Sequence, residues 1–189
     1  AERYRVLPLL AGLGAFFGLT KPRPKTTQFT YHSDVQNVFP GMMPSIYNHS
    51  YAISADLVIP EEGAEGVIVA DADHLGGWAL FVQDGKLKHT YSFLGIQEFK
   101  QESENQLPTG EVGVEMVFTA DENKPATGGE VSLLVNGEPV GSGRMEHTVP
   151  QRFTGYAGMD IGRDNGLVVD RSYEDKAPFA FTGEIKKVV

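Results

Sequence analysis

The sequence WALFVQDGKLKHTYSF, residues 78–93, decides the fold. Trp78, Leu80 and Val82 fall on one side of an extended chain, because successive side chains in a strand point to opposite faces. The alternation resumes on the far side of Asp84-Gly85. An Asp-Gly pair between two alternating runs is typical of a two-residue hairpin, since both central positions of a type I′ turn need positive φ. The stretch therefore predicts two antiparallel strands joined by a tight turn.

The same period-two pattern extends over most of the chain. A second hairpin is predicted at Asn136-Gly137, and further alternating runs lie at residues 53–59, 112–118, 131–135 and 179–185. About ten to twelve strand candidates follow one another with turn residues between them, and no strong amphipathic helix competes. The sequence thus predicts an all-β fold, a two-sheet antiparallel β-sandwich of the jelly-roll, concanavalin-like kind. An up-and-down barrel stays open as an alternative, because periodicity alone does not separate the two architectures.

Composition excludes several classes of partner. The net charge of −9 repels phosphates and anionic lipid, so no nucleic-acid partner is expected. No run of eighteen apolar residues is present, so no membrane span is expected either. The absence of cysteine fits a bacterial periplasmic or secreted protein as well as a cytoplasmic one, and the compartment stays open.

The chain divides into two parts by composition. Residues 1–25 are predicted to be an N-terminal connecting segment and linker, because Pro22 and Pro24 withhold backbone donors, and residues 26–189 form the predicted β-sandwich domain. The apolar run Val6–Leu19 follows two arginines, as in a secretory signal. A segment docked along a surface or a short helix is the structural alternative.

The usual catalytic motifs are missing. The chain has no cysteine, no phosphate-binding loop, no paired-histidine helix and no nucleophile elbow. Glu111 and Glu115 have the spacing of a sandwich glycosidase pair, but their neighbours Val112, Val114 and Met116 define the opposite, apolar face. The solvated side of a strand accounts for these two glutamates, and no catalytic residue is predicted.

Acidic and loop residues supply the remaining candidates. Three groups of residues are rich in side-chain oxygens but lack the spacing of a calcium-binding loop. We interpret them as turn formers, so no metal site is predicted. The groups are Asp71 with Asp73, Asp121 with Glu122 and Asn123, and Asp160 with Asp164 and Asn165. Polar residues on loops bind ligands more often than core residues do. On that ground the candidates for a substrate-facing rim are His49, Asp73, His74 and Arg163.

Several short motifs occur in the order found in one known family. They are Tyr4–Leu9 (YRVLPL), Gly76-Gly77-Trp78, Asp84–Leu87 (DGKL), Asp160–Asp164 (DIGRD) and Pro178–Ile185 (PFAFTGEI). In this order they resemble the C-terminal region of bacterial-type arylsulfatases, over nearly the whole chain. Two stretches depart from the family pattern: Leu10–Gly12, where charged residues are usual, and the segment Asp71–His74.

The resemblance implies a role without chemistry of its own. In that family the region is a β-sandwich that packs on an α/β catalytic domain, and the formylglycine and the calcium ion lie in the catalytic domain. This chain has no cysteine and no Ser-x-Pro-x-Arg from which a formylglycine could be made, so no cofactor is expected here. The implied partner is the sulfatase catalytic domain, with sulfated substrate at the rim.

Three functional hypotheses follow. The first is a non-catalytic C-terminal accessory domain of an arylsulfatase-type sulfuric ester hydrolase, which stabilises the catalytic domain and shapes its substrate entrance. The second is a carbohydrate-binding, concanavalin-like module that uses exposed aromatic residues, Trp78 among them, on a concave sheet face. The third, a sandwich glycoside hydrolase that depends on Glu115, ranks last.

Overall fold

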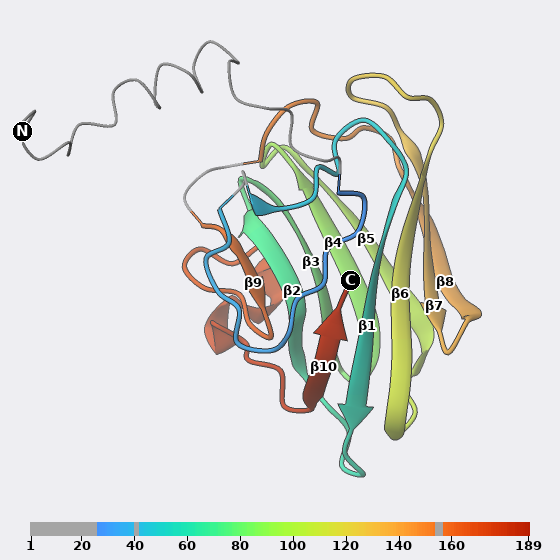
Figure 1. Ribbon diagram of the computed structural model, residues 1–189, viewed down its shortest axis with the longest axis vertical. Helices are drawn as coiled ribbons and strands as arrows, with labels where there is room; N and C mark the ends of the chain where they lie inside the picture. Colours follow the sequence, from blue (N-terminus) through green and yellow to red (C-terminus); the bar gives the residue numbers. More distant parts are fainter. Residues whose placement is uncertain (1–25, 40–41, 154–156) are drawn as a thin grey trace, which may run out of the picture.

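The fold consists of two five-stranded antiparallel sheets packed face to face (Figure 1). The computed structural model describes residues 26–39, 42–153 and 157–189, so the predicted connecting segment 1–25 lies outside it. Sheet A has the strand order β10-β1-β6-β7-β8 and sheet B the order β5-β4-β3-β2-β9. The strands are β1 (Tyr51–Ile59), β2 (Gly66–Asp73), β3 (Gly76–Gln83), β4 (Lys86–Phe93), β5 (Gln97–Gln106), β6 (Gly110–Ala120), β7 (Gly129–Val135), β8 (Glu138–Met145), β9 (Met159–Ile161) and β10 (Glu184–Val188). The predicted all-β sandwich is confirmed.

Both predicted hairpins are present. Asp84 and Gly85 connect β3 to β4 with φ of 57° and 73°, and Asn136 and Gly137 connect β7 to β8 with φ of 51° and 85°. These are the positive angles that a type I′ turn requires, and Asp, Asn and Gly tolerate them. Local turn chemistry therefore sets the register of both pairs.

The main core lies between the sheets. Met116 and Phe118 from sheet A meet Leu80 and Leu87 from sheet B, and all four are fully buried. Burial of each such side chain stabilises the fold by about 1.5–3 kcal/mol relative to exposure. The predicted inward face of residues 78–93 is therefore correct.

Sheet B is covered on its outer face as well. A 3-10 helix, η3 (Arg171–Lys176), places Tyr173 against Phe81 and Phe179, with ring centroids 5.0 Å apart in both contacts. This second cluster explains why every residue of β2 and of β3 is buried.

Two local predictions were wrong. The last strand begins at Glu184 and not near residue 179, because Phe179 takes a φ of 45° and turns into the cluster under η3. Asp71 and Asp73 are not turn residues, because β2 runs through both before the chain reverses at His74 and Leu75.

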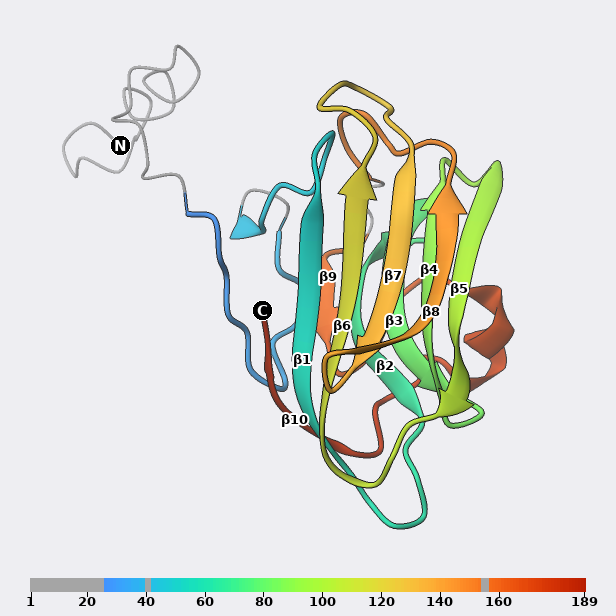
Figure 2. The same cartoon turned by 90° about the vertical axis from the view of Figure 1, so that its right-hand side faces the viewer.

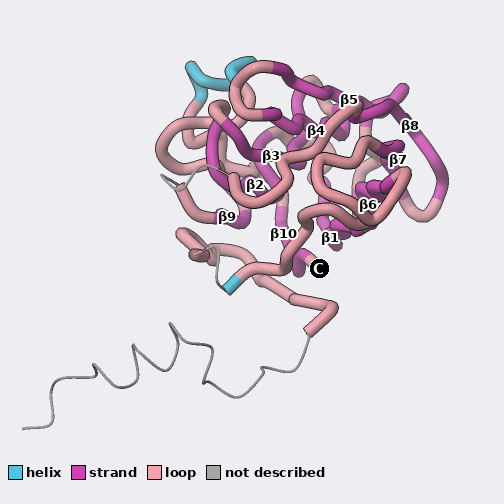
Figure 3. Tube along the Cα trace, turned by 90° about the horizontal axis from the view of Figure 1, so that it is seen from above, coloured by secondary structure: helices cyan, strands magenta, loops and turns pink. Residues whose placement is uncertain are grey.

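The two side edges of the sandwich differ. At one edge β5 and β8 lie against each other, which is visible in Figure 2. At the other edge β9 and β10 do not pair, and residues 26–39 and 42–50, here called the strap, pass outside them (Figure 3). Tyr31 exchanges two backbone hydrogen bonds of 2.8 Å with Val188 of β10, and Val38 exchanges two of 3.0 and 3.1 Å with Met159 of β9. The strap therefore links the sheets across the open edge.

No helix among the described residues has the length and apolarity to cross a membrane.

Candidate ligand-binding site

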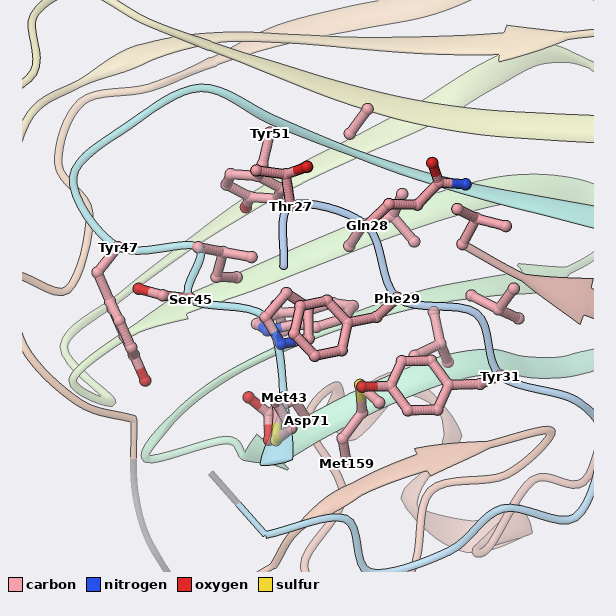
Figure 4. Close-up of a pocket in the computed structure, with 18 of the residues that line it drawn as sticks. Thr27, Gln28, Phe29, Tyr31, Met43, Ser45, Tyr47, Tyr51, Asp71 and Met159 are labelled. Atoms are coloured by element: carbon pink, nitrogen blue, oxygen red, sulfur yellow. The ribbon is translucent and has the colours of Figure 1, made fainter. Parts of the chain in front are cut away.

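A cavity of about 790 Å³ lies at the open edge, beneath the strap. Its walls come from the strap, from β1, β2, β3, β9 and β10, and from residues 152, 153 and 189. Figure 4 shows Phe29 projecting from the strap into the space that Tyr51 and Asp71 border. Cavities of about 300–1,000 Å³ with apolar walls and a few convergent polar groups are the usual form of small-molecule sites.

Asp71 and Trp78 form the floor of the cavity. They are direct partners in the ladder between β2 and β3, so both side chains leave the sheet on the same face. Asp71 is 5% exposed and Trp78 3% exposed. Burial raises the pKa of Asp71 to about 7, an effect that the Trp78 indole and the Ala72 amide partly oppose and the charge of Asp160 reinforces. The carboxyl group at the floor is therefore poised between its neutral and charged forms near neutral pH.

Two other polar groups at the cavity have no hydrogen-bond partner among the residues that the structure describes. The indole nitrogen of Trp78 faces the Asp71 carboxyl group outside hydrogen-bond geometry, and the hydroxyl oxygen of Tyr51 is buried without a partner among the described residues. Burial raises the pKa of Tyr51 well above its ordinary value. A buried polar group without a hydrogen bond costs about 1–3 kcal/mol. A ligand that supplies the missing bonds would recover this energy.

The mouth of the cavity is aromatic and cationic. Tyr47 and Phe153 pack with ring centroids 5.2 Å apart, and the Tyr47 hydroxyl accepts a hydrogen bond of 3.2 Å from the Phe153 amide. Arg152 is exposed beside them and forms no ion pair with any described residue. Burial raises the pKa of Tyr47, and the positive charge of Arg152 lowers it in part. Arg152 therefore lies close enough to act on groups at this mouth.

The predicted rim residues do not gather at one site. His49 lines the cavity, with its ring Nδ1 2.8 Å from the Ser50 carbonyl oxygen. Asp73 is fully buried; one oxygen accepts a hydrogen bond from the Leu75 amide, and the other has no partner in the described part of the chain. His74 bonds the Val168 carbonyl, and Arg163 lies 3.9 Å from Asp34. The last three do not line the cavity, and a substrate role for any of the four stays a prediction.

The other candidates of the sequence have structural surroundings. Asp164 is buried and accepts hydrogen bonds from Tyr173 and the Val169 amide, which goes beyond the predicted turn role. Burial raises its pKa to about 6. Asp121 is ion-paired with Arg144 and Glu111 with Lys186. Within the described part of the chain no three histidines, aspartates or glutamates are arranged to hold a metal ion.

Sequence reasoning missed Asp71, Tyr51 and Arg152 as site residues. A signal for Asp71 was present: it follows Val69 at an interval of two, in phase with the inward face of β2, and it precedes Gly76-Gly77-Trp78. No local signal marks Arg152. Trp78 was predicted to be an exposed aromatic on a concave sheet face, and this was wrong, because it points into the sandwich.

Comparisons with known proteins agree on the fold. No family model matches the chain, and no curated protein matches it. The chain is similar to the CBM40 of the Ruminococcus gnavus IT-sialidase, with 13% identity, a TM-score of 0.50 and 75% of each chain covered. It is similar to the leech intramolecular trans-sialidase, with 10% identity, a TM-score of 0.53, and 85% of this chain but 25% of that one covered.

A third similar structure is the native heptameric SAP-like pentraxin from Limulus polyphemus. Identity is 15% and the TM-score is 0.42, and the chain spans 62% of the length of that protein while 74% of this chain is covered. At identities this low, the similarity to the CBM40 and to the trans-sialidase shows a shared fold and leaves the family open. The class that fold and cavity define is a jelly-roll β-sandwich with a cavity at one edge.

Proposed function

We propose that this domain is a non-catalytic carbohydrate-binding module that holds its ligand in the cavity at the open edge. The observation that carries the proposal is the pairing of the Asp71 carboxyl group with the Trp78 indole on the floor of an otherwise largely apolar cavity. A sugar hydroxyl both donates and accepts, so it can bond to Asp71 as donor and to Trp78 as acceptor. The apolar faces of sugar rings pack on aromatic side chains, which the cavity also offers.

Two further observations support this proposal. Two of the similar structures belong to sialidases, and one of them is named as a CBM40, a carbohydrate-binding module. Glu115, on which a glycosidase reading depends, lies on the strand face opposite to the buried Val114 and Met116. We therefore propose binding and not hydrolysis.

The test is glycan binding by the full chain and by a matched pair of variants. The chain is screened on a glycan array, and the best ligand is titrated by calorimetry. Asp71→Asn keeps the shape of the side chain but removes the charge, and we expect Kd to rise by about tenfold or more, since a hydrogen bond to a charged group contributes about 1.5–3 kcal/mol. Asp84→Asn at the exposed β3–β4 turn, where Asp84 is 77% exposed, is the control and should bind normally. An array on which no glycan binds would reject the proposal.

A second candidate function rests on an exposed apolar surface. Leu75, Leu94, Ile96 and Leu167 are 45%, 48%, 80% and 51% exposed, and they are here called the hairpin-tip patch. They share one end of sheet B: Gly95 lies against Leu75, and the amide of His74 bonds the carbonyl of Val168. Neighbouring exposed apolar residues mark protein contacts more often than isolated ones do.

We propose, as this second candidate, that the hairpin-tip patch docks on the catalytic domain of an arylsulfatase. The resemblance of the sequence motifs to the C-terminal region of that family supports the choice of partner. The domain would then stabilise the catalytic domain, with no chemistry of its own.

Co-expression tests the accessory role. An arylsulfatase catalytic domain produced with this chain should be retained by it, and Leu94→Asp with Ile96→Asp should abolish retention while thermal unfolding stays unchanged. Thr119→Asp, on the exposed outer face of sheet A, is the control. Sulfate release from an aryl sulfate by the purified chain alone, or retention that survives the double substitution, would contradict this candidate.

A further inference from the structure

The cavity has opposite polar characters at its two ends. The floor carries the buried carboxyl group of Asp71, and the mouth carries the exposed guanidinium of Arg152. Arg152 differs from most cations of the described residues, although Arg171 on η3 is unpaired as well. Arg144, Lys100 and Lys186, for example, all neutralise carboxylates, whereas Arg152 has no ionic partner among the described residues. Because the Arg152 guanidinium forms no ion pair with a described residue, it is available to bind a ligand.

The rest of the mouth also favours an anionic group. The Tyr47 hydroxyl accepts its hydrogen bond from the Phe153 amide, so its own hydrogen is left to donate. His49 is less suitable: its Nδ1 lies 2.8 Å from a carbonyl oxygen, which can only accept, so Nδ1 carries the hydrogen and Nε2 of the neutral ring is an acceptor. Arg152 and Tyr47 are therefore the donors of the mouth.

We infer that the cavity selects an acidic saccharide, whose carboxylate or sulfate group lies at Arg152 and whose hydroxyl groups lie at Asp71 and Trp78. The inference rests on the carbohydrate-binding function proposed above and names its ligand class. A planar guanidinium forms two parallel hydrogen bonds with a carboxylate or sulfate group, which a neutral hydroxyl cannot match. The orientation follows from charge, because an anionic group placed at the floor would face the Asp71 carboxylate.

Size limits the ligand further. A cavity of about 790 Å³ is within the usual range for a small ligand, so it accommodates one or two sugar rings and not a long polymer buried along its length. Because the floor is closed by β2 and β3, a longer chain would enter with one end. The acidic unit at Arg152 would then be the terminal residue or its neighbour.

Calorimetry with paired ligands tests this inference. The probes are lactose 3′-sulfate against lactose, and a glucuronyl-glucose disaccharide against cellobiose, so the two arms distinguish sulfate from carboxylate. In at least one arm the acidic member should bind tenfold or more tightly than its neutral partner, and the preference should shrink as salt is raised.

Two arginine variants complete the experiment. Arg152→Gln should remove the acidic preference, so that the acidic and the neutral member of each pair bind with similar affinity. Arg171→Gln is the matched control, because Arg171 is exposed and unpaired among the described residues but lies on η3, away from the cavity. Equal binding of acidic and neutral sugars, or a preference that survives Arg152→Gln, would overturn the inference while the proposed carbohydrate function stands. Failure of every glycan on the array would reject that function, and this inference with it.

Discussion

The two side edges of the sandwich show how one pair of sheets produces both a closed core and a cavity. At the β5–β8 edge Gly141 of β8 lies against the backbone of Glu102, and Gly143 lies against the side chain of Gln101, so neither position has room for a Cβ. At the β9–β10 edge the sheets stay apart, and the strap spans them. The small residues of β8 therefore allow the close approach of the sheets at the closed edge.

Buried polar groups differ between these edges as well. At the closed edge one ring nitrogen of His89 forms a 2.8 Å hydrogen bond with the side chain of Gln101, and the other has no partner among the described residues but lies in the core, away from the cavity. At the open edge Trp78 and Tyr51 have no hydrogen-bond partner among the described residues. Unpaired groups that line a cavity are what a binding site requires, whereas the His89 pair serves packing.

The largest expected effect comes from forcing the closed edge apart. A Cβ on Gly141 would lie 2.3 Å from the Glu102 carbonyl oxygen, so Gly141→Val must displace β8 from β5. We expect a loss of about 3 kcal/mol or more in the free energy of unfolding, the upper range for overpacking. Urea titration measures it. Gly113→Ala on β6, where the nearest atom is 3.8 Å away, should change stability by less than about 1 kcal/mol. Equal losses in the two variants would show that close approach does not hold this edge.

The buried histidine of the closed edge should make the fold sensitive to acid. Burial lowers the pKa of His89 to about 4, and the hydrogen bond that its ring donates to the Gln101 side-chain oxygen acts in the opposite direction. An unfolded chain takes up this proton below about pH 6.5, so the stabilisation is complete above that pH and is lost as pH falls toward 4. The loss is on the order of 2–3 kcal/mol.

His89→Gln isolates this contribution. The raised pKa values of Asp71 and Asp164 act with the opposite sign in the same pH range, so only the difference between wild type and variant is diagnostic. Denaturant unfolding at pH 7.5 and pH 4.5 should show a smaller acid-induced loss in the variant. Parallel losses would mean that His89 does not titrate in this range.

The closed edge was far more predictable from sequence than the open one. The hairpins at Asp84-Gly85 and Asn136-Gly137 depend on residues next to each other, and the inward face of Leu80 and Leu87 depends on a period of two. The cavity depends on contacts between distant residues, such as Val38 with Met159 and Asp71 beside Asp160. We chose candidate site residues among the polar residues of predicted loops, and this selected His49, which lines the cavity. It did not select Asp71, because Asp71 was interpreted as a turn residue, whereas β2 runs through it.

The buried carboxyl group of Asp71, on the floor of the cavity, should lower the stability of the fold while it contributes to ligand binding. Because the pKa of Asp71 rises to about 7, the folded protein keeps a proton that the unfolded chain releases above about pH 4. This carboxyl group thus stabilises the fold less and less as pH rises from 4 through 7, and it is a net cost at pH 8. Asp71→Asn should raise stability by about 1–2 kcal/mol at pH 8 and by little at pH 5, although it weakens glycan binding. Thermal unfolding at the two pH values measures this, and a variant less stable than wild type at pH 8 would contradict it.

The smallest expected effect separates the two kinds of tyrosine in the interior. Tyr51 has a buried hydroxyl without a partner among the described residues, so Tyr51→Phe removes an unpaired polar group and should raise the free energy of unfolding, by up to about 1 kcal/mol. The hydroxyl of Tyr91 accepts a 2.8 Å hydrogen bond from the Val149 amide, so Tyr91→Phe leaves that amide unpaired and should cost about 1–3 kcal/mol. Chemical denaturation of the two variants compares their free energies of unfolding.

Glycan titration should give the opposite ranking of the two variants, because of the two residues only Tyr51 lines the cavity. Tyr51→Phe should lower the affinity severalfold, while Tyr91→Phe should not. A Tyr51 variant that loses stability but binds normally would assign its hydroxyl to the core and remove it from the site.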